Sequence, residues 1–180
     1  MFLYRSLGMG AWLIGLMVAA CIGCHAQSVP TPRSGPIFVV RHAEKADPSN
    51  PDTPLSSAGE ARAASLAEVL RSRGIKAVFA TEYIRTQQTV APAARDAGVD
   101  VQVVQNAERA SLIERARTAA IAGAVLIAGH SNTVPDIVKE LSGEAVDGIN
   151  ENEFDNLFEV IIEADGHMRV VRSKYGEPPH

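Results

Sequence analysis

The sequence is poor in cysteine, in aromatic residues and in positive charge. Its two cysteines, Cys21 and Cys24, lie near the N-terminus, so the rest of the chain cannot form an internal disulfide and depends on packing for stability. Seventeen Lys and Arg residues against 21 Asp and Glu give a formal net charge of −4. Because nucleic-acid-binding domains normally show a clustered basic surface, this balance predicts no nucleic-acid partner. No Cys/His cluster or Asp-x-Asp pair has the spacing of a metal site, so neither a metal nor another cofactor is expected.

The N-terminal residues have the pattern of an export signal. Arg5 precedes an uncharged apolar run from Leu7 to Ala20, about the length of the hydrophobic region of a secretory signal. A membrane-spanning helix needs about 20 apolar residues, and this run is shorter and contains glycine. Residues 18–21 resemble the bacterial lipobox, in which the cysteine is lipidated. Residues 1–20 are therefore predicted to be a lipoprotein signal peptide cleaved before Cys21, the lipid attachment site; cleavage after Ala26 without lipidation is the alternative.

Export by either route places the mature protein in the bacterial cell envelope, on the periplasmic side. Lipidation would add an N-terminal membrane anchor, with residues 21–35, which are rich in Pro and Ser, as a tether. Residues 36–175 then form the one folded domain, long enough to bury a single core. The sequence leaves the oligomeric state open.

Strand and helix patterns alternate along this domain. Short β-branched or apolar runs predict strands, and apolar residues at helical spacing predict helices. A capping box at Ser57–Glu60 opens the first helix, which ends near Gly74 and carries Ala61, Leu66, Val69 and Leu70 on one face. The expected strands are 37–41, 75–80, 100–104 and 124–128, and the later helices are 83–97, 110–122 and 133–141.

The C-terminal part breaks the alternation. Two apolar segments, 157–164 and 168–173, flank Asp165-Gly166-His167, which is a hairpin turn signal. Four strand–helix alternations followed by a hairpin predict an α/β fold: a three-layer α/β/α arrangement with a mostly parallel sheet and an antiparallel C-terminal hairpin at its edge.

Two histidines follow predicted strands. His42 comes after Arg41 at the end of the first strand, and His130 comes after Gly129 at the end of the fourth. Because the carboxyl ends of parallel strands open onto one crevice, these histidines are expected to face each other. Arg85 lies in the first turn of a helix, where free N–H groups also favour anions. Two imidazoles and two guanidiniums indicate a pocket for a phosphoryl group.

The residue types suit phosphoryl transfer. Arginine donates two parallel hydrogen bonds and stays charged, so Arg41 and Arg85 are candidate clamps for the phosphoryl oxygens. A neutral imidazole is a good nucleophile, and His42 could form a covalent phosphohistidine that water later hydrolyses. His130 is expected to bind the phosphate as a cation, so the two histidines need different protonation states.

Four segments resemble the histidine phosphatase (phosphoglycerate-mutase-like) superfamily, branch 1, in the order in which that family carries them. They are Val39–His42, Leu55–Gly59, Thr81–Thr89 and Gly129–Ser131. The resemblance implies a phosphorylated His42, a phosphate held by Arg41, Arg85 and His130, and no metal. Ala43 replaces the family's commonest glycine, as in smaller members. Ser131 stands where phytase-type members carry an aspartate, so this chain is similar to the branch without that acid.

The general acid is not evident. Phosphoglycerate mutases take a glutamate from a longer segment than the one between Arg85 and His130, and Glu108 is the nearest candidate here; the alternative is a solvated residue at a helix start. Small members that cleave phosphohistidine lack an obvious acid. Glu44 and Lys45 order the entry loop, or Lys45 reaches the leaving group; the sequence does not choose between these roles.

The expected function is hydrolysis of phosphomonoesters by a metal-independent phosphatase that acts on a small phosphorylated substrate. The first alternative is a protein that binds phosphate or a phospho-ligand without turnover. The second is a phosphomutase, which the short segment before His130 disfavours.

Overall fold

A computed structural model of the chain describes residues 34–163 and 165–178. The predicted signal peptide, the lipid-attachment site Cys21 and most of the predicted tether lie outside these residues. Gly35, placed by the sequence at the end of the tether, donates its N–H to the Ala120 carbonyl at 2.7 Å. No helix in the described part of the chain is long and apolar enough to cross a membrane.

Strands and helices alternate as the sequence predicts, with bounds that differ by a few residues. The strands are β1 (Ile37–Arg41), β2 (Ile75–Ala80), β3 (Val101–Val103), β4 (Ala124–Gly129), β5 (Asn156–Ile162) and β6 (Met168–Lys174). The helices are α1 (Ser57–Leu70), α2 (Ile84–Ala97), α3 (Arg109–Ala120) and α4 (Val134–Ser142), with a short 3₁₀ turn, η1 (Asn106–Glu108), before α3.

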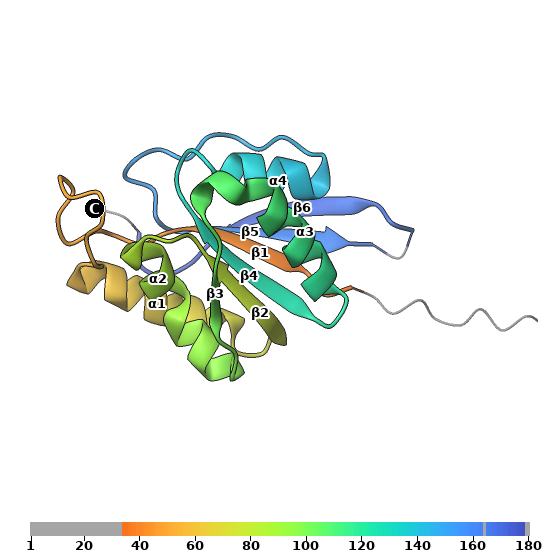
Figure 1. Cartoon of the computed structure of the whole chain (residues 1–180), viewed down its shortest axis with the longest axis horizontal. Coiled ribbons are helices and arrows are strands. Elements are labelled where there is room, and N and C mark those ends of the chain that lie inside the picture. The colour runs from red at the N-terminus through yellow and green to blue at the C-terminus, as the bar shows by residue number, and fades with distance from the viewer. Residues whose placement is uncertain (1–33, 164, 179–180) are drawn as a thin grey trace, which may run out of the picture.

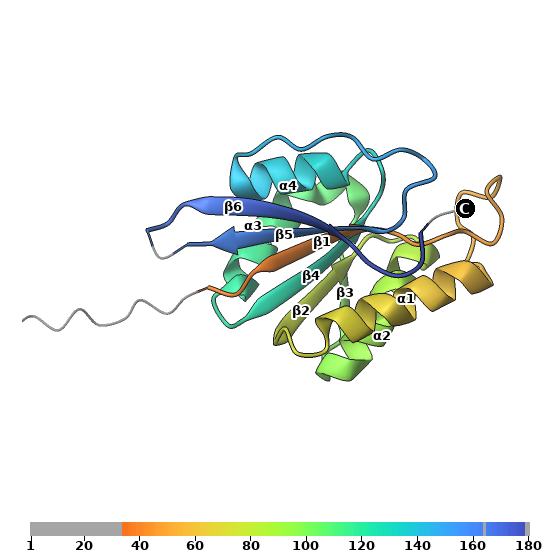
Figure 2. The same cartoon turned by 180° about the vertical axis from the view of Figure 1, so that it is seen from behind.

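The strands form one sheet in the order β3-β2-β4-β1-β5-β6. Strands β1 to β4 pair in parallel, whereas β5 runs antiparallel to β1 and β6 antiparallel to β5. Helices α1 and α2 cover one face of the sheet, and α3 and α4 cover the other (Figures 1 and 2). The prediction of a three-layer fold with an antiparallel hairpin at the sheet edge is confirmed.

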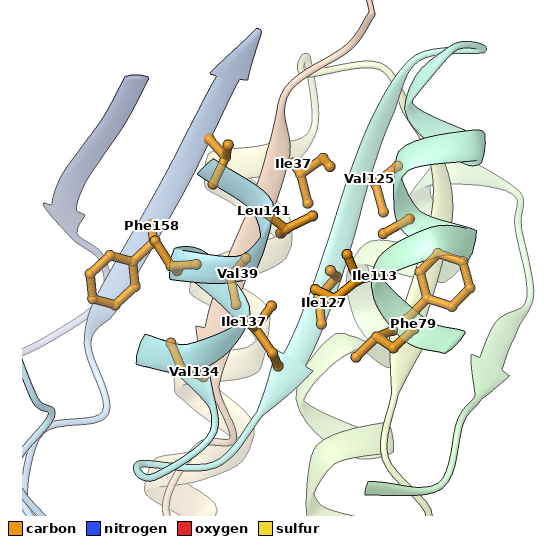
Figure 3. Close-up of a cluster of buried hydrophobic side chains, with 14 of the residues drawn as sticks. Ile37, Val39, Phe79, Ile113, Val125, Ile127, Val134, Ile137, Leu141 and Phe158 are labelled. Carbon is orange, nitrogen blue, oxygen red and sulfur yellow. The ribbon is translucent and has the colours of Figure 1, made fainter. Parts of the chain in front are cut away.

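Alternate residues of the central strands build two cores. Ile37 and Val39 of β1 point toward α3 and α4, where they meet Val125 and Ile127 of β4 (Figure 3). Phe38 of β1 belongs to the other core, beneath α1 and α2. A strand buried on both faces needs apolar residues at successive positions, which accounts for the continuous runs in β1 and β4.

Helix α1 differs from its predicted start and face. Its N-cap is Ser56, one residue before the predicted capping box, and the Ser56 hydroxyl accepts a hydrogen bond from the Gly59 N–H at 3.1 Å. Ala61 and Val69 are exposed, because the buried stripe runs through Arg62, Leu66 and Leu70 at helical spacing. The buried charge of Arg62 hides this stripe from a pattern based on apolar residues alone.

The carboxyl ends of the central strands β1 and β4 lie at the same end of the sheet. Two loops converge there from distant parts of the sequence: residues 42–56, which follow β1, and residues 143–155, which connect α4 to β5 (Figure 1). The first turn of α1 packs against the first of these loops, since a Cβ on Gly59 would lie only 2.3 Å from the Glu44 carbonyl oxygen.

Gly59→Ala therefore tests how closely α1 packs on the loop after His42. Alanine forms helix better than glycine by about 1 kcal/mol, but the added methyl group must push the Glu44 backbone away. We expect the variant to lose about 1–3 kcal/mol of unfolding free energy in urea titrations. Ala64→Gly, at an exposed position of the same helix, should lose about 1 kcal/mol for lack of helix propensity alone. A stabilised Gly59→Ala variant would contradict the close packing.

Candidate active site

The paired strands β1 and β4 place both histidines at the same edge of the sheet. Arg41 lies opposite Gly129 in the register, and the His42 N–H donates to the Gly129 carbonyl at 2.9 Å. The rings of His42 and His130 are 5.4 Å apart between centroids, in an edge-on arrangement. The two histidines therefore face each other.

These residues line a polar pocket of about 300 Å³. Arg41, His42, Arg85 and His130, the four candidates from the sequence motifs, all contribute to it. Its other walls come from the loops and helix starts at this edge of the sheet: Lys45, Tyr83, Asn106, Ser131, Asn132 and Glu151.

Hydrogen bonding defines the tautomer of His42. Its Nδ1 lies 2.8 Å from the Ala43 carbonyl oxygen, which can only accept, so Nδ1 carries the proton and Nε2 keeps a lone pair. Burial lowers the pKa of His42 to about 3, with the positive charges of Arg85 and Arg41 acting in the same direction. At neutral pH His42 is thus an uncharged imidazole whose Nε2 is unprotonated.

His130 is oriented in the opposite sense. Its Nδ1 lies 3.3 Å from Nη2 of Arg85, which can only donate, so Nδ1 accepts and Nε2 donates to the Thr81 hydroxyl at 3.1 Å. Burial, followed by the charge of Arg85, lowers the pKa of His130 to about 4. Beside a guanidinium and out of water, the ring is therefore neutral at pH 7 in the absence of an anion. The expectation that His130 binds the phosphate as a cation concerns the phosphate-bound site and stays a prediction.

Buried threonines of the Thr81–Thr89 motif support both histidines. The hydroxyls of Thr81 and Thr86 are 2.9 Å apart, and the Thr86 hydroxyl lies 2.7 Å from the Tyr83 carbonyl, so a chain of hydrogen bonds leads from His130 into the start of α2. One turn later, the Thr89 hydroxyl accepts from the Ala43 N–H at 2.9 Å and donates to the Arg85 carbonyl at 2.7 Å. Helix α2 thereby holds the backbone beside His42 and the ring of His130.

Arg41 is almost fully buried and holds the 143–155 loop. Its Nη1 donates to the carbonyls of Asn150, Glu151 and Glu153 at 2.8, 2.9 and 3.1 Å. Its Nη2 donates to the Glu151 carboxylate at 2.9 Å. The guanidinium carbon lies 4.2 Å from the ring centroid of Phe154, a cation–π contact that keeps the guanidinium plane in place.

Arg85 is held by the other loop and by an aromatic ring. Its Nη1 donates to the Pro51 carbonyl, its Nη2 faces His130, and its guanidinium carbon lies 4.4 Å from the ring centroid of Tyr83. The Nε atoms of Arg41 and Arg85 are buried with no hydrogen-bond partner. A buried guanidinium N–H left without an acceptor is costly, and both arginines line the same pocket, which favours an anionic ligand.

Glu108 does not line this pocket. It lies exposed in η1, and its neighbour Asn106 contributes to the pocket wall instead. The carboxylate in the pocket belongs to Glu151, which no motif signals because it lies in the long loop after α4. Its contact with Arg41 joins two residues that are 110 positions apart in the sequence.

Glu44 and Lys45 have different surroundings. The Glu44 carboxylate forms a two-point ion pair with the buried Arg62 of α1, at 2.7 to 3.0 Å, and so fixes the loop that follows His42. Lys45 lines the pocket, and its ammonium donates to the Pro48 carbonyl at 3.0 Å. Within the described ranges, no group of three or more His, Cys, Asp and Glu side chains could hold a metal ion.

The lowered histidine pKa values give the protein a specific pH dependence. Below about pH 6.5 the unfolded chain binds protons that His42 and His130 reject in the folded state, so stability falls as the pH decreases. The two histidines together add up to about 2.7 kcal/mol per pH unit to the slope with which the free energy of unfolding decreases. Urea unfolding at several pH values from 7 to 4 measures the slope. A His42→Gln/His130→Gln variant should show a shallower slope, and equal slopes would contradict the buried neutral pair.

Thr81→Val tests the hydrogen bond of His130 Nε2–H. Valine has nearly the shape of threonine but cannot accept this bond, so we expect Nε2–H to lose its partner while Nδ1, which still faces the Arg85 donor, stays unprotonated. The imidazole ¹⁵N chemical shift of Nε2 at neutral pH reports the loss of the bond directly. Thr81→Ser keeps the hydroxyl and should keep the original shift, and an unchanged spectrum in the valine variant would remove Thr81 from this role.

Comparisons with known proteins agree with this arrangement. The model of the histidine phosphatase superfamily (branch 1) matches residues 37–108, which contain the first three motif segments. A comparison with curated protein sequences found no match.

Solved structures of phosphatases share the fold. The mycobacterial glucosyl-3-phosphoglycerate phosphatase superimposes with a TM-score of 0.59 at 13% identity, over 79% of this chain and 99% of that one. The protein histidine phosphatase SixA, complexed with tungstate, gives a TM-score of 0.60 at 18% identity, over 77% and 96%. At these identities the likeness establishes the fold alone. The family match adds that residues 37–108 of this chain are similar to the histidine phosphatase superfamily, branch 1.

Proposed function

We propose that the protein is a metal-independent phosphatase that hydrolyses phosphomonoesters through a phosphohistidine on His42. One observation carries the proposal. His42 has a tautomer fixed by the Ala43 carbonyl and an unprotonated Nε2, and it shares its pocket with two buried arginines whose Nε–H groups have no partner. A nucleophile and donors for an anion thus occupy the same small space.

The first step is attack on phosphorus. Arg41, Arg85 and His130 hold the phosphoryl oxygens, while Nε2 of His42 attacks in line with the leaving oxygen, so that a P–N bond forms as the P–O bond breaks. The incoming negative charge favours protonation of His130 at Nδ1, which then donates to the phosphoryl group instead of accepting from Arg85. Lys45 on the pocket wall stabilises the charge that develops on the leaving oxygen, which takes its proton from solvent.

The second step returns His42 to its starting state. A water molecule attacks phosphorus and releases a proton to solvent, the P–N bond breaks and inorganic phosphate leaves. The same donors stabilise both transition states, because the charge in each is spread over the phosphoryl oxygens. Glu108 has no part in this scheme, since it does not line the pocket.

The proposed substrate is a small phosphorylated molecule of the cell envelope, such as a sugar phosphate, or a phosphate ester scavenged as a nutrient. Two features support this class: the leader sequence, which predicts export, and a polar pocket of about 300 Å³, which suits a small hydrophilic ester. Export disfavours phosphorelay proteins of the cytosol. Of the two phosphatases compared above, the mycobacterial one, named for a phosphorylated sugar acid, is therefore nearer to this proposal than SixA.

His42→Ala tests the central role in this scheme. We expect hydrolysis of p-nitrophenyl phosphate to fall by at least about 10³-fold, because the variant lacks the nucleophile that divides the reaction into two steps. His167→Ala, which changes an exposed histidine in the β5–β6 turn, serves as the matched control and should keep full activity. Activity retained by His42→Ala would contradict the assignment.

The same assay separates the alternatives. A panel of phosphate esters that bind without turnover would favour the binding protein, and transfer of the phosphoryl group to a sugar acid rather than to water would favour the mutase. Activity lost on treatment with a chelator would contradict the metal-independent mechanism.

A further inference from the structure

The Glu151 carboxylate lies on a guanidinium that the proposed phosphatase needs for phosphate. Its Oε2 accepts from Nη2 of Arg41 at 2.9 Å, and its Oε1 accepts from the Ser131 hydroxyl at 2.7 Å. Ser131 directly follows His130, so the carboxylate connects the loop after α4 to both strand ends of the site. All three residues line the same pocket.

Arg41 divides its donors between two tasks. Its Nη1 is fully used by the three loop carbonyls of Asn150, Glu151 and Glu153, which hold the loop in place. The opposite edge of the guanidinium carries Nε, which is buried without a partner, and Nη2, which donates to Glu151. Side-on recognition of a phosphoryl group uses two adjacent N–H donors, so a phosphate on this edge meets the Glu151 carboxylate.

The two partners differ in their freedom to move. Arg41 is 3% exposed and stacked on Phe154, whereas the side chain of Glu151 is 84% exposed. Hydrogen bonds from Ser131 and the charges of Arg41 and Lys45 lower the pKa of Glu151, so it is a carboxylate at neutral pH. An exposed carboxylate can turn toward solvent at little cost, while the loop backbone remains bound to Nη1 through contacts that do not involve the carboxylate.

We propose that Glu151 is a built-in competitor for the phosphate-binding edge of Arg41, so that a phosphoryl group binds by displacing its carboxylate. The proposal rests on the proposed function to the extent that phosphate is the ligand of this pocket. Glu151 then sets the affinity of the site for phosphate. Before phosphate binds, the carboxylate accepts the hydrogen bond of Arg41 Nη2, and the loss of this ion pair reduces the free energy gained when phosphate replaces it. It also favours release of inorganic phosphate after hydrolysis, since the carboxylate returns to Nη2.

Glu151→Gln tests this exchange. The amide nearly keeps the shape of the side chain but removes its charge, so it competes weakly for Arg41. We expect the dissociation constant of inorganic phosphate, measured by titration calorimetry on the purified protein, to fall about fivefold, the scale of an exposed ion pair. The KM for p-nitrophenyl phosphate should fall in parallel, with kcat changed by less than about threefold.

Asp147→Asn is the matched control for charge. It removes one negative charge from the same loop at an exposed position that does not line the pocket. We expect its phosphate affinity to stay within about twofold of the wild type, because charges exposed to solvent at a distance are screened by salt. An equal gain in both variants would mean that net charge, rather than displacement at Arg41, sets the affinity, and would overturn the proposal.

Two other outcomes of Glu151→Gln would also overturn it. Unchanged or weaker phosphate binding would show that the carboxylate does not compete. A fall in kcat of a hundredfold, with loss of the alkaline limb of the pH–rate profile, would instead make Glu151 a proton donor to the leaving group. The proposed function fails separately: tighter phosphate binding in Glu151→Gln with no turnover by either protein would support the exchange and contradict the phosphatase.

Discussion

Parallel pairing of β1 with β4 determines where the polar groups of the site lie. The register sets Arg41 opposite Gly129, and the next residue along each strand is a histidine. Because both strands are buried on both faces, neither can slip without exposing its core residues. A carbonyl at the end of β4 accepts from the His42 N–H, which extends the pairing by one residue into the pocket itself. The apolar sheet thus holds two imidazoles at a fixed separation.

Burial then determines the chemistry. Removal from water, reinforced by two guanidiniums, keeps both histidines neutral, and backbone or hydroxyl partners fix which nitrogen of each carries the proton. The arginines are themselves held by carbonyls of the two loops, so each uses some of its N–H donors to fix a loop, while its Nε is buried without a partner. This division explains how positive charge can be concentrated in a buried site within a chain whose net charge is −4.

The sequence predicts the sheet, the layers and the four motif residues because these depend on local patterns and on strand ends. Ile37 to Val40 and Ala124 to Gly129 are continuous apolar runs, which leave little choice of strand or position. The buried face of α1 cannot be predicted from apolar residues alone, because Arg62 lies on that face and is paired with Glu44, a contact between different elements. Glu151 and Phe154 belong to an irregular loop whose sequence has no helix or strand periodicity. Their contacts with Arg41 form only when the chain folds and brings distant segments together. The protonation state of His130 in the site without phosphate could not be predicted for a related reason: the sequence shows the residue but not the buried, positively charged surroundings that lower its pKa.

The central claim is that His42 carries the phosphoryl group during turnover. The most direct measurement quenches the wild-type protein during hydrolysis of a phosphate ester and locates the bound phosphoryl group by mass spectrometry of its peptides and by ³¹P NMR. We expect an acid-labile phosphoryl group on Nε2 of His42, the nitrogen that the Ala43 carbonyl leaves unprotonated. A phosphoryl group on another residue, or full turnover with no phosphoenzyme formed at any stage, would contradict the account.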